Sequence, residues 1–136
     1  MGLDNGITLY SKKAIAIPDE VQVLETSMSG PEFGFGYELC YWRKCWGLRR
    51  EIAHALQATT EYVGKSWLTI SDVKSIWRAI TEVNSERTWE DGNNLWTYKE
   101  IKPNLERSLL ALEWLVSFMR EHEGEDWFMV EFYDSY

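Results

Sequence analysis

The chain has 136 residues, a formal net charge of -8 at pH 7 and a sequence pI of about 4.8. This length fits a single domain, expected over residues 1–136, with enough chain to bury a hydrophobic core. The acidic balance argues against direct binding of nucleic acid, because nucleic-acid-binding domains are usually basic. No apolar run approaches the roughly 20 residues of a membrane span, so we expect a cytoplasmic protein without a membrane partner.

The first third of the chain is predicted to form strands. Apolar and polar residues alternate within residues 6–17 and again within residues 21–27, and the turn-forming Pro18 separates the two ranges. The first range predicts one or two strands and the second predicts one. A further strand is expected over residues 36–41, directly after a glycine-rich loop.

Helices are predicted to follow these strands. Apolar residues recur at helical spacing in residues 42–57, which would place Arg43 and Arg50 on one face of a first helix. A second helix is expected over residues 72–84, where Ser71 has the side chain of a good N-cap.

The second helix carries its apolar stripe on one side, so Lys74 and Arg78 are expected to point outward. The third helix is expected over residues 103–121, since proline is favoured at the start of a helix. Alternation returns in residues 127–133 and predicts a closing strand, placed beside the first strand of the chain. These elements indicate an α+β fold, with a small, mostly antiparallel sheet of about four strands and about three helices packed on one face.

Residues 41–46 read Tyr-Trp-Arg-Lys-Cys-Trp and form a basic, aromatic stretch in this acidic chain. Arginine holds phosphate in a fixed fork while an aromatic ring covers a base, so the stretch suits an anionic ligand that bears a ring. Two polar residues near the start of the chain are expected to hydrogen-bond the sugar or base edges of such a ligand. The predicted ligand-binding residues are Asp4, Asn5, Tyr41, Trp42, Arg43, Lys44 and Arg50.

A purely structural interpretation of the same stretch stays open. Trp42 and Trp46 fit the buried stripe of the predicted first helix, and the arginines have Glu38 and Glu51 as nearby acids to pair with. The two interpretations differ in whether the cations converge on a cavity or are consumed by ion pairs.

Acidic residues gather near the end of the chain, where no Lys or Arg follows Arg120. This segment is either a solvated rim or a surface that docks on a basic partner and imitates the charge of nucleic acid. The predicted partner-binding residues are Glu121, Glu123, Glu125 and Asp126.

The sequence contains no complete catalytic or metal-binding motif. Residues 64–66 read Gly-Lys-Ser, but Thr59 stands where a phosphate-binding loop needs its first glycine. Cys40 and Cys45 do not have the spacing of a redox or zinc site. We therefore expect no metal and no cofactor, and an enzyme only if His54 or a pair of carboxylates lies in a deep pocket.

The chain resembles a family of small, largely uncharacterised proteins of phages, prophages and mobile elements. The resemblance rests on Met-Gly-Leu-Asp at residues 1–4, Tyr-Trp-Arg-Lys at residues 41–44 and an aromatic end over residues 126–136. It implies a phage setting, a host-cell cytosol location and an α+β fold, but brings no known activity. Small cytosolic phage proteins without catalytic motifs are frequently counter-defence factors, which is an association from setting.

Three functions follow as hypotheses. The first is a non-catalytic, phage-encoded counter-defence protein that binds and sequesters a nucleotide-type signal of host immunity. The second is an acidic inhibitor that docks on a basic surface of a host defence protein, and the third is an enzyme. Exposed tryptophans would favour a homo-oligomer, and the sequence leaves open which of its eight Trp are exposed.

Overall fold

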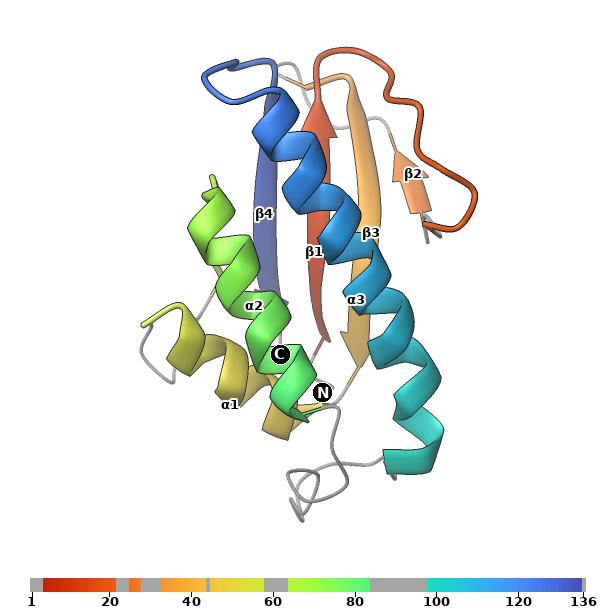
Figure 1. The fold of residues 1–136 in the computed structure, drawn as a ribbon, viewed down its shortest axis with the longest axis vertical. Helices are drawn as coiled ribbons and strands as arrows, with labels where there is room; N and C mark the ends of the chain where they lie inside the picture. Colours follow the sequence, from red (N-terminus) through yellow and green to blue (C-terminus); the bar gives the residue numbers. More distant parts are fainter. Residues whose placement is uncertain are drawn as a thin grey trace.

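The computed structural model describes residues 4–21, 25–27, 33–43, 45–57, 64–83 and 98–135. A four-stranded sheet in the order β2-β3-β1-β4 is covered on one face by three helices (Figure 1). This arrangement confirms the predicted α+β class with a small antiparallel sheet. The elements are β1 (Asp4–Ser11), β2 (Glu25–Ser27), β3 (Phe35–Arg43), α1 (Trp46–Ala55), α2 (Ile70–Val83), α3 (Tyr98–Glu121) and β4 (Phe128–Ser135).

The sheet consists of three long antiparallel strands, to which β2 adds three residues at one edge. β1 lies in the centre and pairs with β3 on one side and β4 on the other, so the first and last strands are neighbours as predicted. Ile7 and Leu9 of β1 are fully buried, and successive side chains of a strand point to opposite faces. The odd-numbered residues of β1 therefore face the helices.

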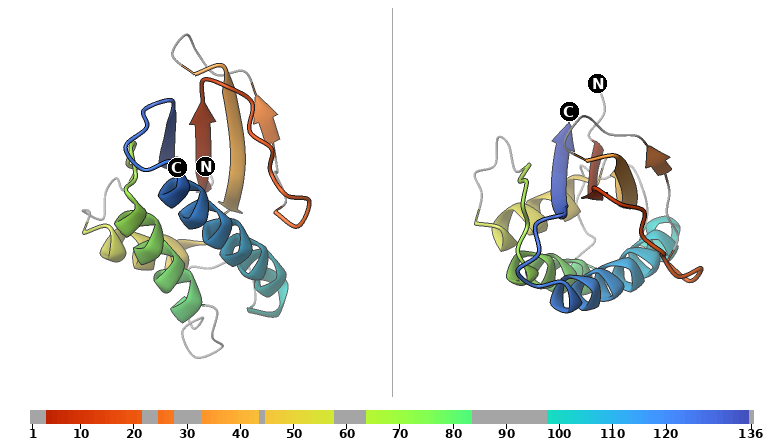
Figure 2. Two further views of the ribbon diagram at one scale, coloured as in Figure 1. Left: turned by 45° about the horizontal axis from the view of Figure 1, so that its top comes forward. Right: turned by 90° about the horizontal axis from the view of Figure 1, so that it is seen from above.

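The hydrophobic core lies between the sheet and the helices. Figure 2 shows the helices together on one side of the sheet, and none of the described helices lies on the other side. Each helix turns an apolar stripe inward, as the helical spacing predicted. The largest fully buried side chains are Trp42, Phe132, Ile7, Leu9, Leu48, Ile52, Ile76, Ile80, Leu105, Leu112 and Leu115.

The boundary between β3 and α1 differs from the prediction. β3 continues to Arg43 and α1 begins at Trp46, so the helix expected over residues 42–57 starts four residues later. Trp42 pairs with Asn5 across the sheet. The strand buries Trp42 in the core, as the predicted helix would also have done. A short apolar stretch suits either a strand or a helix, and its pairing with β1 favours the strand.

The starts of α2 and α3 also differ from the prediction. α2 begins at Ile70, and Thr69 rather than Ser71 caps it: the Asp72 N–H donates to Thr69 Oγ1 (3.1 Å), and the Thr69 N–H donates to Asp72 Oδ2 (2.9 Å). α3 begins at Tyr98 and contains Pro103 in its interior, so the helix does not start at the proline. Within the described residues, no helix has the length and apolarity to cross a membrane.

Candidate functional site

The basic, aromatic stretch does not form one surface, because residues 41–43 lie at the end of β3 whereas Trp46 begins α1. Alternation turns Tyr41 and Arg43 toward the helix-free face of the sheet and Trp42 toward the core. Trp42 is 0% exposed, and its indole N–H donates to Ser108 Oγ at 3.1 Å. The ring of Trp42 is thus a core group, which corrects the prediction that it contacts a ligand; Lys44 lies outside the described residues.

The two polar residues predicted to assist this site also separate. Asp4 accepts a hydrogen bond from the Tyr41 hydroxyl at 2.8 Å on the helix-free face. Asn5 points the other way, is buried, and donates its side-chain amide to Asp134. Of the pair, only Asp4 lies beside the exposed end of the basic stretch.

The arginines of this region line none of the cavities described below. Arg49 is buried and binds Asp134 with two hydrogen bonds. Arg43 and Arg50 are exposed on β3 and α1, and each has an interaction partner within the protein. The cavities described below are lined by other residues, so a nucleotide site at Arg43 and Arg50 stays a prediction without a cavity to support it.

The acidic segment between α3 and β4 is a different case, because its carboxylates are exposed. Glu125 pairs with His122, whose Nδ1 lies 2.6 Å from Glu125 Oε2, and this hydrogen bond lowers the pKa of the glutamate. Glu121, Glu123 and Asp126 are exposed and form no side-chain hydrogen bond or ion pair in the part of the chain that the structure describes. Their charge remains available to a partner.

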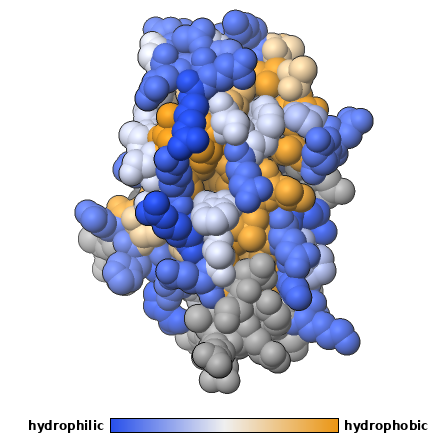
Figure 3. All heavy atoms as spheres, viewed as in Figure 1, coloured by the Kyte–Doolittle hydropathy of each residue, from blue (hydrophilic) through white to orange (hydrophobic). Residues whose placement is uncertain are grey.

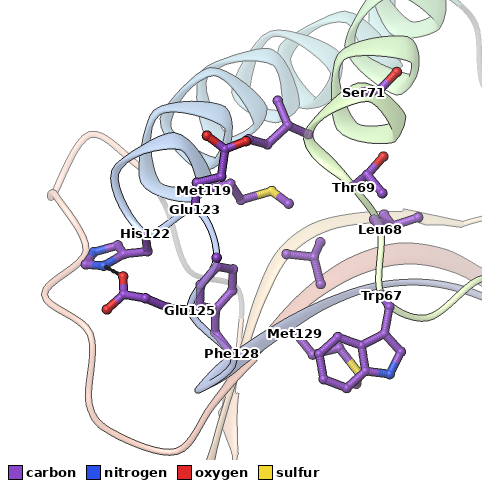
Figure 4. Close-up of a pocket in the computed structure, with 13 residues that line it drawn as sticks. Trp67, Leu68, Thr69, Ser71, Met119, His122, Glu123, Glu125, Phe128 and Met129 are labelled. Atoms are coloured by element: carbon purple, nitrogen blue, oxygen red, sulfur yellow. Dashed lines mark hydrogen bonds and ion pairs between the residues drawn. The ribbon is translucent and has the colours of Figure 1, made fainter.

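Two of these carboxylates line a cavity of about 420 Å³. Figure 4 shows Glu123 beside the end of α3, the His122–Glu125 pair on the same side, and Trp67 on the opposite side next to Met129. The cavity therefore joins an acidic wall to an aromatic one. Its other lining residues are Leu68, Thr69, Ile70, Ser71, Met119, Gly124, Phe128 and Val130.

Trp67 has an unusual backbone conformation for a bulky residue. Its φ is 58°, in the left-handed region, and its side chain is 56% exposed. The residues on both sides are fixed to β4: Lys65 exchanges two backbone hydrogen bonds with Phe132 (2.7 and 2.8 Å), and the Leu68 N–H donates to Val130 O (2.9 Å). Such backbone conformations cost about 1–3 kcal/mol and persist where the surroundings impose them, often at functional sites.

The helix-free face of the sheet continues this acidic and aromatic character. Three tyrosine hydroxyls on it each donate to a carboxylate on another strand, and burial, followed by the carboxylates, raises the pKa of all three. The pairs are Tyr41 with Asp4 (2.8 Å), Tyr133 with Glu38 (2.8 Å) and Tyr10 with Glu131 (3.4 Å).

An aromatic row connects this face to the cavity. The Tyr10 ring lies 6.4 Å from the Phe33 ring, which lies 6.0 Å from the Trp67 ring. Gly6 allows Tyr133 to reach across β1, since a Cβ at this glycine would lie 2.5 Å from the Tyr133 hydroxyl oxygen. The acidic cavity and the tyrosine face thus form one continuous region that favours cations.

The chemistry of the remaining groups is limited. No set of three or more His, Cys, Asp and Glu within the described ranges could hold a metal ion. Burial raises the pKa of the Cys40 and Cys45 thiols to about 12, so both stay protonated at neutral pH. His54 lines a separate cavity of about 300 Å³ with Glu51 and Glu82.

Some of these residues had a signal in the sequence and others had none. The alternation that placed Phe128, Val130 and Phe132 in the core also placed Glu131 and Tyr133 on the opposite face. Trp67 had no such signal, because a left-handed conformation is predicted from glycine or asparagine and not from tryptophan.

Comparisons with known proteins found no family model, no curated protein and no solved structure that matches the chain. The resemblance to small phage and prophage proteins therefore rests on its sequence motifs and stays a prediction.

Proposed function

We propose that this chain is a non-catalytic binding protein that docks on a basic surface of another protein. One observation carries the proposal: the exposed Trp67 ring lines the same cavity as the Glu123 carboxylate, which has no partner among the described residues. The strained backbone at Trp67 would be retained because it holds the ring where a partner meets it.

An arginine or lysine side chain of the partner suits this cavity. Its cationic head would lie between the Trp67 ring and the carboxylates of Glu123 and Glu125, combining a cation–π contact with charge-assisted hydrogen bonds. Its aliphatic stem would pack on Met119 and Phe128, which line the cavity. The net charge of -8 would speed the encounter with a basic surface.

The phage setting implied by the sequence resemblance gives the first partner to test. It would be a basic surface of a host defence effector. Such a surface would otherwise hold nucleic acid, whose charge this acidic protein would imitate. The alternative, sequestration of a nucleotide-type signal at the basic stretch, requires that Arg43→Ala abolish the heat of binding of cyclic or linear nucleotides in calorimetric titration.

The docking proposal is tested by calorimetric titration with an arginine-rich peptide at low and physiological salt. We expect binding that weakens as salt rises, because exposed charges are screened. Trp67→Ala and Glu123→Gln should each weaken binding by about tenfold, as expected for a lost cation–π contact or charge-assisted hydrogen bond.

Glu106→Gln is the matched control, since Glu106 is also exposed on α3 and loses the same charge away from the cavity. Its binding should stay within about twofold of the unchanged protein. Equal weakening in Glu106→Gln and Glu123→Gln would mean that only net charge matters, and the cavity would then not be the docking site.

A further inference from the structure

Another cavity, on the helical side of the molecule, has a charge opposite to that of the acidic cavity beside Trp67. It measures about 340 Å³ and lies between α2 and α3, which pack against each other. Figure 3 shows this side of the molecule, with hydrophilic residues along the helices and hydrophobic residues between them. The lining residues are Lys74, Trp77 and Arg78 of α2, with Glu113, Val116, Ser117 and Arg120 of α3.

The charges of this cavity are unusual for so acidic a chain. Three cations and one carboxylate line it, a net of two positive charges (three minus one), whereas the chain carries -8. The side chains of Lys74, Arg78 and Arg120 form no hydrogen bond or ion pair with any residue in the described ranges. Lys74 and Arg78 are four residues apart on one helix face, where like charges destabilise the helix slightly. Their placement in the same cavity as Arg120 therefore adds like-charge repulsion rather than stability.

Trp77 adds a flat aromatic ring to this wall. The residue is half-buried, and its indole N–H is buried without a hydrogen-bond partner among the described residues. A buried donor that is left unpaired is costly, and tryptophan in a buried position usually finds a partner. The cavity thus brings together spare cations and an aromatic ring, which is the chemistry that the sequence suggested for residues 41–46.

We propose that the α2–α3 cavity binds a phosphate-bearing ligand with a flat ring, of the nucleotide class. Lys74 and Arg120, on facing helices, would hold the phosphate, and the Trp77 ring would contact the base. The volume lies at the small end of the range for small-molecule sites, which fits a mononucleotide better than a larger ligand. This site is separate from the acidic docking region, so the failure of one proposal would leave the other unaffected.

The test is calorimetric titration of the full chain with adenosine monophosphate, adenosine and inorganic phosphate, at about 50 mM salt to limit screening. Adenosine monophosphate should bind more tightly than either fragment. Lys74→Gln and Arg120→Gln should each weaken its binding by about tenfold. Glu113→Gln should strengthen binding, because it removes the carboxylate that opposes the anion.

Two controls make the result specific. Arg107→Gln removes an exposed cation from the same helix outside the cavity and should leave binding unchanged. Arg43→Ala distinguishes this cavity from the basic stretch at the end of β3 and should also leave the binding of adenosine monophosphate unchanged. The indole N–H signal of Trp77 in NMR spectra, assigned with Trp77→Phe, should shift on titration.

Three outcomes would overturn the proposal. The absence of binding at millimolar adenosine monophosphate would remove the site. Equal losses in Arg107→Gln and Lys74→Gln would reduce binding to unspecific charge attraction. Phosphate that binds as tightly as the nucleotide would show that the ring of Trp77 is not used.

Discussion

Arg49 and Asp134 form a buried, bidentate ion pair that joins α1 to the last strand. Arg49 Nε donates to Asp134 Oδ1 (3.0 Å) and Nη2 donates to Oδ2 (2.9 Å), and the two side chains are 7% and 0% exposed. The Asn5 amide also donates to Asp134, so helix, first strand and last strand meet at one carboxylate. The pair therefore fixes the position of α1 at the end of the sheet.

Removing one partner should leave a buried, uncompensated charge. We expect Arg49→Met to lower the free energy of unfolding by about 3–5 kcal/mol in urea denaturation. The neighbouring Arg50→Met is the matched control, since Arg50 is exposed and its loss should cost less than about 1 kcal/mol. Similar costs for the two variants would contradict a structural role for the buried pair.

The second prediction concerns the hydrogen bond that the Trp42 indole N–H donates to Ser108. Ser108 Oγ receives the Trp42 N–H at 3.1 Å and itself donates to the Asn104 carbonyl at 2.9 Å. Ser108→Ala would leave the buried indole N–H unpaired, and we expect it to lower the free energy of unfolding by about 1–3 kcal/mol.

Ser117→Ala is the comparison for this variant. Ser117 lies on the same helix and donates to the carbonyl four residues earlier (3.3 Å), but it is exposed and accepts no buried donor. Its substitution should change stability by less than about 0.5 kcal/mol. Urea denaturation of both variants measures the difference, and equal values would show that the Trp42 indole does not depend on Ser108.

Sequence patterns predicted the fold class because strand and helix periodicity is local. Ile7 and Leu9 signalled their strand, and the apolar stripe around Ile76 signalled its helix, within residues close in the chain. Trp42 was misplaced because a short apolar stretch suits a strand as well as a helix, and the deciding contact with Asn5 is distant in sequence.

The candidate sites were predictable in part for the same reason. Glu123 and Glu125 were recognisable from charge alone. Lys74 and Arg78 were expected to point outward, but their meeting with Arg120 depends on how α2 packs against α3. Packing between distant segments leaves no local pattern, so the basic cavity could not be found from the sequence.

The third prediction concerns the pH dependence of the α2 cap. Burial acts to raise the pKa of Asp72, but hydrogen bonds from the Thr69 N–H and from Lys65 Nζ (3.0 Å) outweigh it, so the pKa is lowered. A lowered carboxyl pKa contributes stability that is present at neutral pH and is lost as the pH falls through the folded-state pKa. This loss should therefore occur below about pH 4.

Asp72→Asn measures this contribution. The variant should lower the free energy of unfolding by about 1 kcal/mol at pH 7. The difference from the unchanged protein should shrink toward zero as the pH falls to about 2, since protonated Asp72 and the amide that replaces it are then both uncharged. Asp126→Asn is the control, because Asp126 is exposed and has no side-chain partner within the described ranges. If Asp72→Asn lowers the free energy of unfolding by the same amount at every pH, the charge of Asp72 contributes no stability.

The last prediction separates the backbone strain at Trp67 from the role of its ring. Trp67→Gly and Trp67→Ala both remove the ring and its contact with Phe33, but only glycine adopts a φ of 58° without strain. We expect Trp67→Gly to be more stable than Trp67→Ala by about 1–2 kcal/mol in urea denaturation. Both variants should bind an arginine-rich peptide equally weakly, because both lack the ring. If the two variants are equally stable, the left-handed conformation carries no strain, and it then offers no support for a docking role of Trp67.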